Sequence, residues 1–125
     1  MKVKNLTVGI KSLEQALKEA AQTMKEIQKG HSPKPTRGTY FVTFQAMLKV
    51  LTPKRLELLR TIREKHPKSV YELAAITHRH IKNVQEDVDF LNRVDLVSIS
   101  RKSTTRRRVV PTVNYDQLNF RISFI

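Results

Sequence analysis

The sequence predicts an α+β fold, because amphipathic helical patterns occupy most of the chain and short strand-like segments accompany them. Three observations support this prediction. Apolar residues recur at three- and four-residue steps in four segments, polar and apolar residues alternate near both ends of the chain, and Ser-x-x-Glu or Ser-x-x-Gln caps mark helix starts. We therefore expect helices packed with a few strands.

The stretch from Ser69 to Ile99 organises this fold. Ser69-x-x-Glu72 predicts the start of a short helix, and residues 77–79 interrupt its pattern. A second apolar stripe begins near residue 80 and includes Val84 and Val88, and a strand-like segment follows. A short helix, a tight turn, a longer helix and a strand in this order are typical of a winged helix-turn-helix domain.

The second helix of such a domain enters the major groove of DNA, and its first turns meet the base edges. Asn and Gln pair with adenine, and Lys and Arg pair with guanine or phosphate. The residues predicted to bind DNA are Arg79, His80, Lys82, Asn83, Gln85 and Glu86 on this helix, with Ser69 on the first. The alternative is a merely solvated helix face, because polar residues face outward by default.

The charge of the chain favours a polyanionic partner. Its 125 residues carry a formal net charge of +13, with 24 Lys and Arg against 11 Asp and Glu. The densest basic cluster follows the helix-turn-helix segment, where residues 100–107 read as a hairpin tip, or wing. The residues of this tip and its flank that are predicted to bind DNA are Arg101, Lys102, Thr104, Arg106, Arg107 and Arg108. Charge alone does not distinguish DNA from RNA.

The N-terminal residues 1–50 predict a strand-helix-strand appendage to a winged domain of residues 51–125. Residues 2–8 read as a strand, a helix begins after Ser12 and ends at Gly30, and residues 39–44 read as a second strand that covers the helix. This unit has a thin core, so we expect it to form a homodimer. Alternatively, it folds back on its own winged domain.

Two further segments complete the prediction. Thr52-Pro53 predicts the start of another helix, whose bases Lys54, Arg55, Arg60 and Arg63 read as a solvated face. Residues 116–125 alternate strictly between apolar and polar residues, so we expect a half-buried strand that pairs with another strand edge and contributes to a partner surface.

Several function classes find no support in the sequence. The chain has no cysteine, no run of apolar residues long enough for a signal peptide or a membrane span, and no His spacing typical of zinc sites. Phosphate-binding loops and catalytic motifs are also missing. We therefore expect a cytoplasmic protein that is not an enzyme and has no metal, cofactor or membrane partner.

A resemblance to a known family adds to this interpretation. The motif Leu51-Thr52-Pro53-Lys54-Arg55, the motif Lys82-Asn83-Val84 and the motif Asp95-Leu96-Val97 resemble those of MarR-like winged helix-turn-helix regulators, in particular the TumA-type antitoxins of toxin–antitoxin pairs. The resemblance implies sequence-specific DNA binding, autoregulation and a small toxin as partner. Two residues depart from the family pattern: His78 replaces a turn Gly, and His80 replaces an acidic cap.

The predicted function is thus a dimeric, sequence-specific transcriptional regulator that binds double-stranded DNA and acts as an autoregulating antitoxin. Two alternatives remain open at this stage. One is an RNA-binding or ribosome-associated winged-helix protein, although no aromatic residue for base stacking lies in the wing. The other is a protein–protein module that mainly neutralises a toxin.

Overall fold

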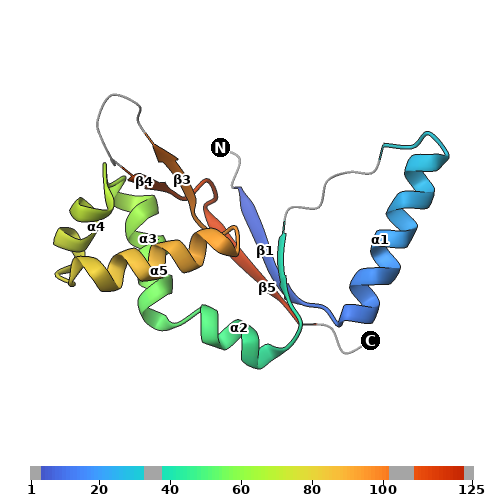
Figure 1. Ribbon diagram of the computed structural model, residues 1–125, viewed down its shortest axis with the longest axis horizontal. Helices are drawn as coiled ribbons and strands as arrows, with labels where there is room; N and C mark the ends of the chain where they lie inside the picture. Colours follow the sequence, from blue (N-terminus) through green and yellow to red (C-terminus); the bar gives the residue numbers. More distant parts are fainter. Residues whose placement is uncertain (1–3, 33–37, 102–108, 123–125) are drawn as a thin grey trace.

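A computed structural model describes residues 4–32, 38–101 and 109–122 and has an α+β fold. Figure 1 shows helices α2 to α5 and the hairpin β3–β4 on one side of a small sheet, with helix α1 standing apart on the other side. Among the described residues, no helix is both long and apolar enough to cross a membrane.

The sheet has three parallel strands in the order β2-β1-β5. They are β1 (Asn5–Ile10), β2 (Gly38–Phe41) and β5 (Gln117–Arg121). The predicted pairing of the two N-terminal strands is confirmed. The last strand of the chain pairs with the first, so strand pairing crosses the boundary predicted at residue 50, and that boundary stays a prediction.

The two faces of the sheet differ in character. Val8 and Phe41 are buried on the inner face, which packs against the helices. The outer face carries the aromatic ring of Tyr40, which lines a groove together with Arg121 of β5. Gly9 and Gly38 lie beneath this ring, where an added Cβ at either position would stand 2.9 Å from a ring carbon.

Four helices build the rest of the core. They are α2 (Phe44–Val50), α3 (Pro53–Lys65), α4 (Val70–Thr77) and α5 (Ile81–Arg93). The predicted start of α3 is confirmed, because Thr52 caps the helix and Pro53 occupies its first position. The fully buried side chains include Leu58, Ile62, Leu73, Val84 and Leu91, so α3, α4 and α5 share one apolar core.

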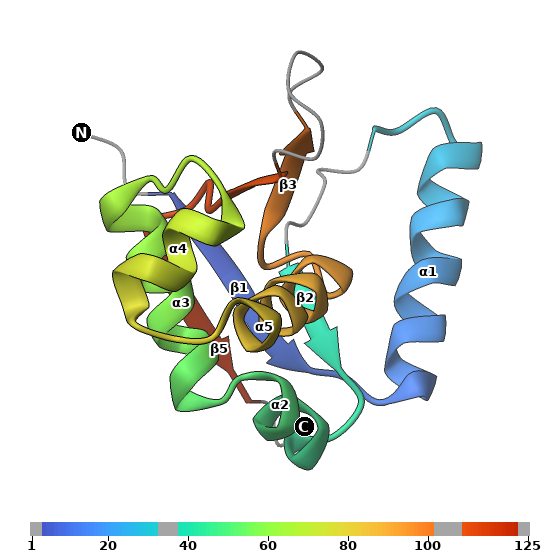
Figure 2. The same ribbon diagram turned by 60° about the vertical axis from the view of Figure 1, so that its left-hand side comes forward.

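Helix α1 (Leu13–Gln28) differs from the prediction. Ser12 caps it and Gly30 adopts a left-handed conformation after its end, as expected. The expected packing of its apolar stripe on the neighbouring strand is wrong, since no residue of α1 is buried. Figure 2 shows α1 beside the body of the protein rather than on the sheet.

The C-terminal strand is covered less than the alternation predicts. Leu118 packs against the core, whereas Phe120 and Ile122 are about half exposed. The strand lies at the edge of the sheet, because only β1 pairs with it.

The hairpin is formed by β3 (Ser98–Arg101) and β4 (Val109–Thr112), which pair antiparallel.

Candidate nucleic-acid interface

Three residues connect α4 to α5. His78 ends α4 in the left-handed conformation with φ 54° and ψ 40°, a region that His tolerates better than most residues other than Gly. His80 caps α5, with its Nδ1 accepting a hydrogen bond from the Lys82 N–H at 3.2 Å. Only three residues therefore separate α5 from α4, and the His80 cap at the start of α5 is exposed.

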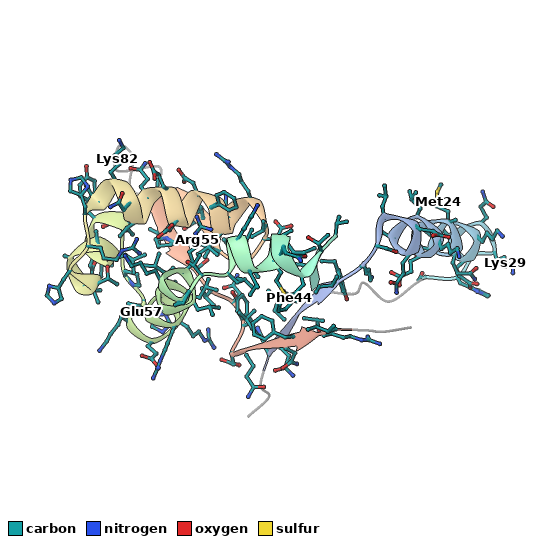
Figure 3. All side chains as sticks on the ribbon, turned by 90° about the horizontal axis from the view of Figure 1, so that it is seen from below. Met24, Lys29, Phe44, Arg55, Glu57 and Lys82 are labelled. Atoms are coloured by element: carbon teal, nitrogen blue, oxygen red, sulfur yellow. The ribbon has the colours of Figure 1, made fainter. Side chains whose placement is uncertain are left out.

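The first two turns of α5 expose most of the predicted DNA-binding residues. Lys82, Asn83, Gln85 and Glu86 are all exposed, while Val84 and Val88 on the opposite side are buried. In Figure 3, Lys82 stands at the outer side of α5, away from the helices beneath it. The exposed set offers a cation, two amides and a carboxylate for hydrogen bonding.

Arg79 does not share this open position. Its Nη2 donates to Asp87 Oδ2 at 2.8 Å, and its side chain is 22% exposed. Its Nη1 is buried and has no hydrogen-bond partner among the described residues. The guanidinium is thus held against α5, where it positions the connection between the two helices.

Asp87 receives a second cation from α3. Arg55 Nε donates to Asp87 Oδ1 at 3.0 Å, and Arg55 Nη1 donates to the carbonyls of Lys49 and Val50 at the end of α2. The guanidinium also lies 4.5 Å from the centre of the Phe90 ring. Figure 3 shows Arg55 between the helices. The interpretation of Arg55 as part of a solvated helix face is therefore wrong.

Arg63, a second member of the same predicted solvated face, is also engaged. Its guanidinium donates to the Asp116 carboxylate and, at 3.2 Å, to the Val113 carbonyl. Asp116 in turn accepts the Lys4 N–H at 2.9 Å, and these contacts lower the pKa of the Asp116 carboxyl below its usual range. The Asp116 side chain therefore joins Arg63 of α3 to Lys4 near the start of the chain.

The hairpin lies beside α4 and α5. A hollow of about 220 Å³ runs between the start of α4, the exposed side of α5 and the hairpin, and its lining includes Gln85, Ile99 and Val109. Arg101 ends β3. The other predicted wing residues, Lys102, Thr104, Arg106, Arg107 and Arg108, lie outside the described residues.

The start of α4 borders the same hollow. The Ser69 hydroxyl accepts the Glu72 N–H at 3.0 Å, which confirms the predicted cap, while Glu72 reaches back to the N–H of Lys68 rather than that of Ser69. Tyr71 also lines the hollow and is 76% exposed. The sequence reasoning missed this tyrosine, although its place off the apolar stripe of α4 is a readable signal. Its hydroxyl is suited to a phosphate oxygen.

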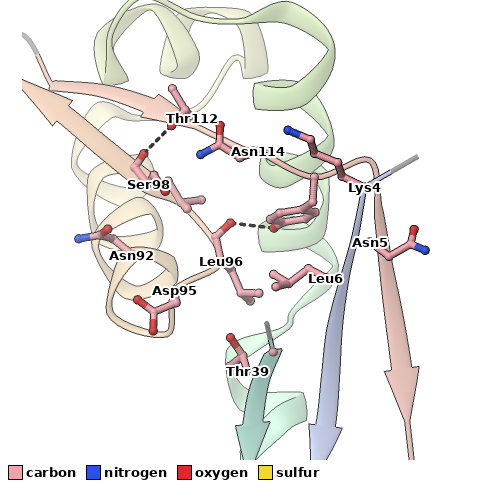
Figure 4. A pocket seen from close by; sticks show the side chains of 13 residues that line it. Lys4, Asn5, Leu6, Thr39, Asn92, Asp95, Leu96, Ser98, Thr112 and Asn114 are labelled. Atoms are coloured by element: carbon pink, nitrogen blue, oxygen red, sulfur yellow. Dashed lines mark hydrogen bonds between the residues drawn. The ribbon is translucent and has the colours of Figure 1, made fainter. Parts of the chain in front are cut away.

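The segment that follows α5 is fastened to the sheet and to the connection between β4 and β5. Thr39 Oγ1 donates to the Val94 carbonyl at 2.7 Å, and the Tyr115 hydroxyl donates to the Leu96 carbonyl at 2.7 Å. Burial raises the pKa of Tyr115. These contacts border a polar hollow of about 420 Å³ whose lining includes Asn92 and Asp95 (Figure 4). The end of α5 is therefore held by these contacts, while Lys82, Asn83, Gln85 and Glu86 of its first turns are exposed.

Comparison with known families adds a further finding. The sequence profile of the HVO_A0114 family matches residues 50–120, which is more than half of the chain. The chain belongs to the HVO_A0114 family. The HVO_A0114 match runs from the last residue of α2 into β5 and includes the exposed face of α5, but not β1, α1 and β2. No curated protein sequence matches the chain.

Proposed function

We propose that this protein is a sequence-specific transcriptional regulator that binds double-stranded DNA through a winged helix-turn-helix domain. In this proposal α4 and α5 form the helix-turn-helix, α5 enters the major groove, and the hairpin β3–β4 is the wing. No catalytic step is part of the proposal.

The observation that carries the proposal is the arrangement around α5. Its first two turns expose Lys82, Asn83 and Gln85, and Asp87 of the same helix pairs with Arg55 and Arg79. A helix that presents amides and a cation from a rigid support suits the reading of base edges, because direct readout needs side chains held at fixed positions.

Charge supports the same proposal. Between residues 82 and 89, the exposed side of α5 carries one positive charge, on Lys82, and two negative charges, on Glu86 and Asp89. This part of α5 alone therefore does not attract a polyanion. The attraction comes instead from the basic segment 101–108, which has five Lys and Arg and no acid and begins at the last residue of β3. We infer that this segment binds phosphates while α5 reads bases.

The proposed partners follow from this function. Two copies of the chain on a short inverted repeat place two α5 helices in successive major grooves, so we propose a homodimer on its operator. The resemblance to TumA-type antitoxins further suggests that the protein regulates its own operon and binds a small toxin encoded beside it.

Binding selection from a random duplex library tests the proposal. The selected duplex should bind at least a hundredfold more tightly than a scrambled duplex, and its affinity should fall steeply with salt. Structured RNA is the decisive competitor in the same assay. Equal affinity for every duplex, or stronger binding to RNA, would exclude a sequence-specific DNA regulator.

A further inference from the structure

Helix α1 exposes a continuous apolar face, which we define as Leu13, Leu17, Ala20, Met24 and Ile27. Leu13, Leu17, Met24 and Ile27 are 56–65% exposed. An amphipathic helix in a folded protein normally buries its apolar stripe. Within residues 4–32, 38–101 and 109–122, no side chain buries the α1 apolar face, so this face is open to a partner.

The opposite side of α1 faces the outer face of the sheet across a groove. A groove between α1 and the outer face of the sheet is lined by Gln15, Glu19 and Gln22 from the helix and by Tyr40 from the sheet. Lys11 pairs with Glu19 and lies 3.7 Å from the centre of the Tyr40 ring. Because polar residues of α1 face the sheet, its apolar face points away from the protein, and Figure 3 shows Met24 projecting into open space.

The order of side chains along this face is symmetric. The steps between neighbouring members alternate between four and three residues, which is the heptad spacing of paired helices. Large residues flank the small Ala20 on both sides. When two copies of α1 run antiparallel, Leu13 meets Ile27 of the second copy, Leu17 meets Met24, and the two Ala20 residues meet at the centre.

We propose that α1 pairs antiparallel with α1 of a second copy of this chain, about a two-fold axis near Ala20. A two-fold interface must be complementary to itself, and the α1 apolar face has this property. The pairing deepens the homodimer of the proposed function by naming its surface. It does not require DNA.

The charges of α1 fit this pairing and do not suit a polyanion. Residues 13–28 contain two Lys and three Glu, a net charge of −1 in a chain of +13. Glu14 lies in the first turn, whereas Lys25 lies in the last turn and Lys29 caps the end. An antiparallel arrangement brings the acidic start of one helix to the basic end of the other and also opposes the two helix dipoles.

The size of the interface sets the expected strength. A helix of 16 residues is about 24 Å long, and one such pair buries less than the roughly 1,600 Å² of a standard interface. We therefore expect a reversible dimer with a micromolar dissociation constant.

Analytical ultracentrifugation of the full chain without DNA tests the pairing. At tens of micromolar, the mass should approach twice the 14.5 kDa of one chain and should fall on dilution. Leu17→Glu should raise the dissociation constant more than tenfold, while Gln22→Glu on the opposite side should raise it less than twofold. Circular dichroism should show both variants folded.

Cysteine crosslinking tests the orientation, because the chain has no cysteine of its own. Ala20→Cys should form a disulfide between copies. Leu17→Cys alone should not, since antiparallel helices hold the two positions about 10 Å apart, beyond the roughly 7 Å limit between Cα atoms. A mixture of Leu17→Cys and Met24→Cys should form the mixed disulfide, which mass spectrometry identifies.

Three results would overturn the pairing. They are a monomer at tens of micromolar, a dimer that Leu17→Glu leaves unchanged, and efficient crosslinking of Leu17→Cys to itself. A monomer would leave the α1 apolar face to a different protein, such as a toxin. Because none of these experiments contains DNA, failure of the pairing and failure of DNA binding are separate outcomes.

Discussion

Arg55 donates to Asp87 at 3.0 Å and thereby joins α3 to α5 across 32 residues of sequence. Asp87 also receives Arg79, so one carboxylate holds two cations that are 17–22% exposed. Asp87 therefore contributes to the stability of the protein and also fixes the orientation of the proposed recognition helix.

Asp87→Ala should lower the free energy of unfolding by about 2–3 kcal/mol, because it leaves two partly buried guanidinium groups without their carboxylate. Urea denaturation measures this change. Asp89→Ala is the matched control, since Asp89 is exposed on the same helix and its loss should change stability by less than about 0.5 kcal/mol. Equal effects of the two variants would contradict the clamp described for Asp87.

Tyr115→Phe should lower the free energy of unfolding by about 1–2 kcal/mol. The substitution keeps the ring but leaves the Leu96 carbonyl without its donor. Thermal or urea unfolding reports the loss. The exposed Tyr71→Phe should be neutral in the same measurement, and a neutral Tyr115→Phe would show that the hydrogen bond does not contribute.

Asn83→Ala should weaken binding to the selected duplex by about 1–3 kcal/mol without changing stability, because Asn83 is exposed in the first turns of α5. Fluorescence anisotropy measures the affinity. Asn92→Ala provides the comparison, since Asn92 is exposed near the end of the same helix. If both variants bind like the wild type, the N-terminal turns of α5 do not read the bases.

His80→Asp should raise the stability of the protein and lower its affinity for DNA. Asp is a better helix cap than His, so we expect the variant to gain about 0.5–1 kcal/mol of stability. The added negative charge near phosphates should nevertheless weaken DNA binding several-fold. His80→Asn supplies the cap without the charge and should retain binding. Tighter binding by His80→Asp would place His80 away from the nucleic acid.

The acid dependence of stability should depend on Asp116. The Lys4 N–H and the Arg63 guanidinium keep the pKa of this carboxyl below its usual value in the folded state. Its stabilising contribution is therefore complete above the unfolded pKa of about 4 and is lost as the pH falls below it. Between pH 5 and pH 3, Asp116→Asn should lose less stability than the wild type in urea denaturation, and an unchanged slope would refute this role.

Local signals in the sequence predicted much of the fold. The caps at Ser12, Thr52 and Ser69 depend on hydrogen bonds to residues three positions away, so the sequence alone is enough to locate them. The apolar stripe of α5 was also readable, because a helix of this length repeats its pattern several times. The stripe also predicts which side of α5 is exposed, and the structure confirms this exposure.

Contacts between distant segments could not be read in this way. Alternation indicates that residues 117–121 form a strand, but it does not specify that β1 is the neighbour, more than a hundred residues earlier. Arg79 has the chemistry of a DNA-binding residue, and only the packing of α5 shows that Asp87 holds it. The side of α1 that faces the sheet likewise depends on Lys11 and Tyr40.

The ring of Tyr40 lies over two glycines and beneath Lys11, which in turn holds Glu19 on α1. A methyl group at Gly9 or Gly38 would stand 2.9 Å from the ring and displace it. The ring and Lys11 lie at the N-terminal end of α1, which is about 24 Å long. A small rotation of the helix at this end therefore moves its C-terminal end by a larger distance. Gly9 and Gly38 thus help to set the direction of α1, and with it the position of the surface proposed for pairing.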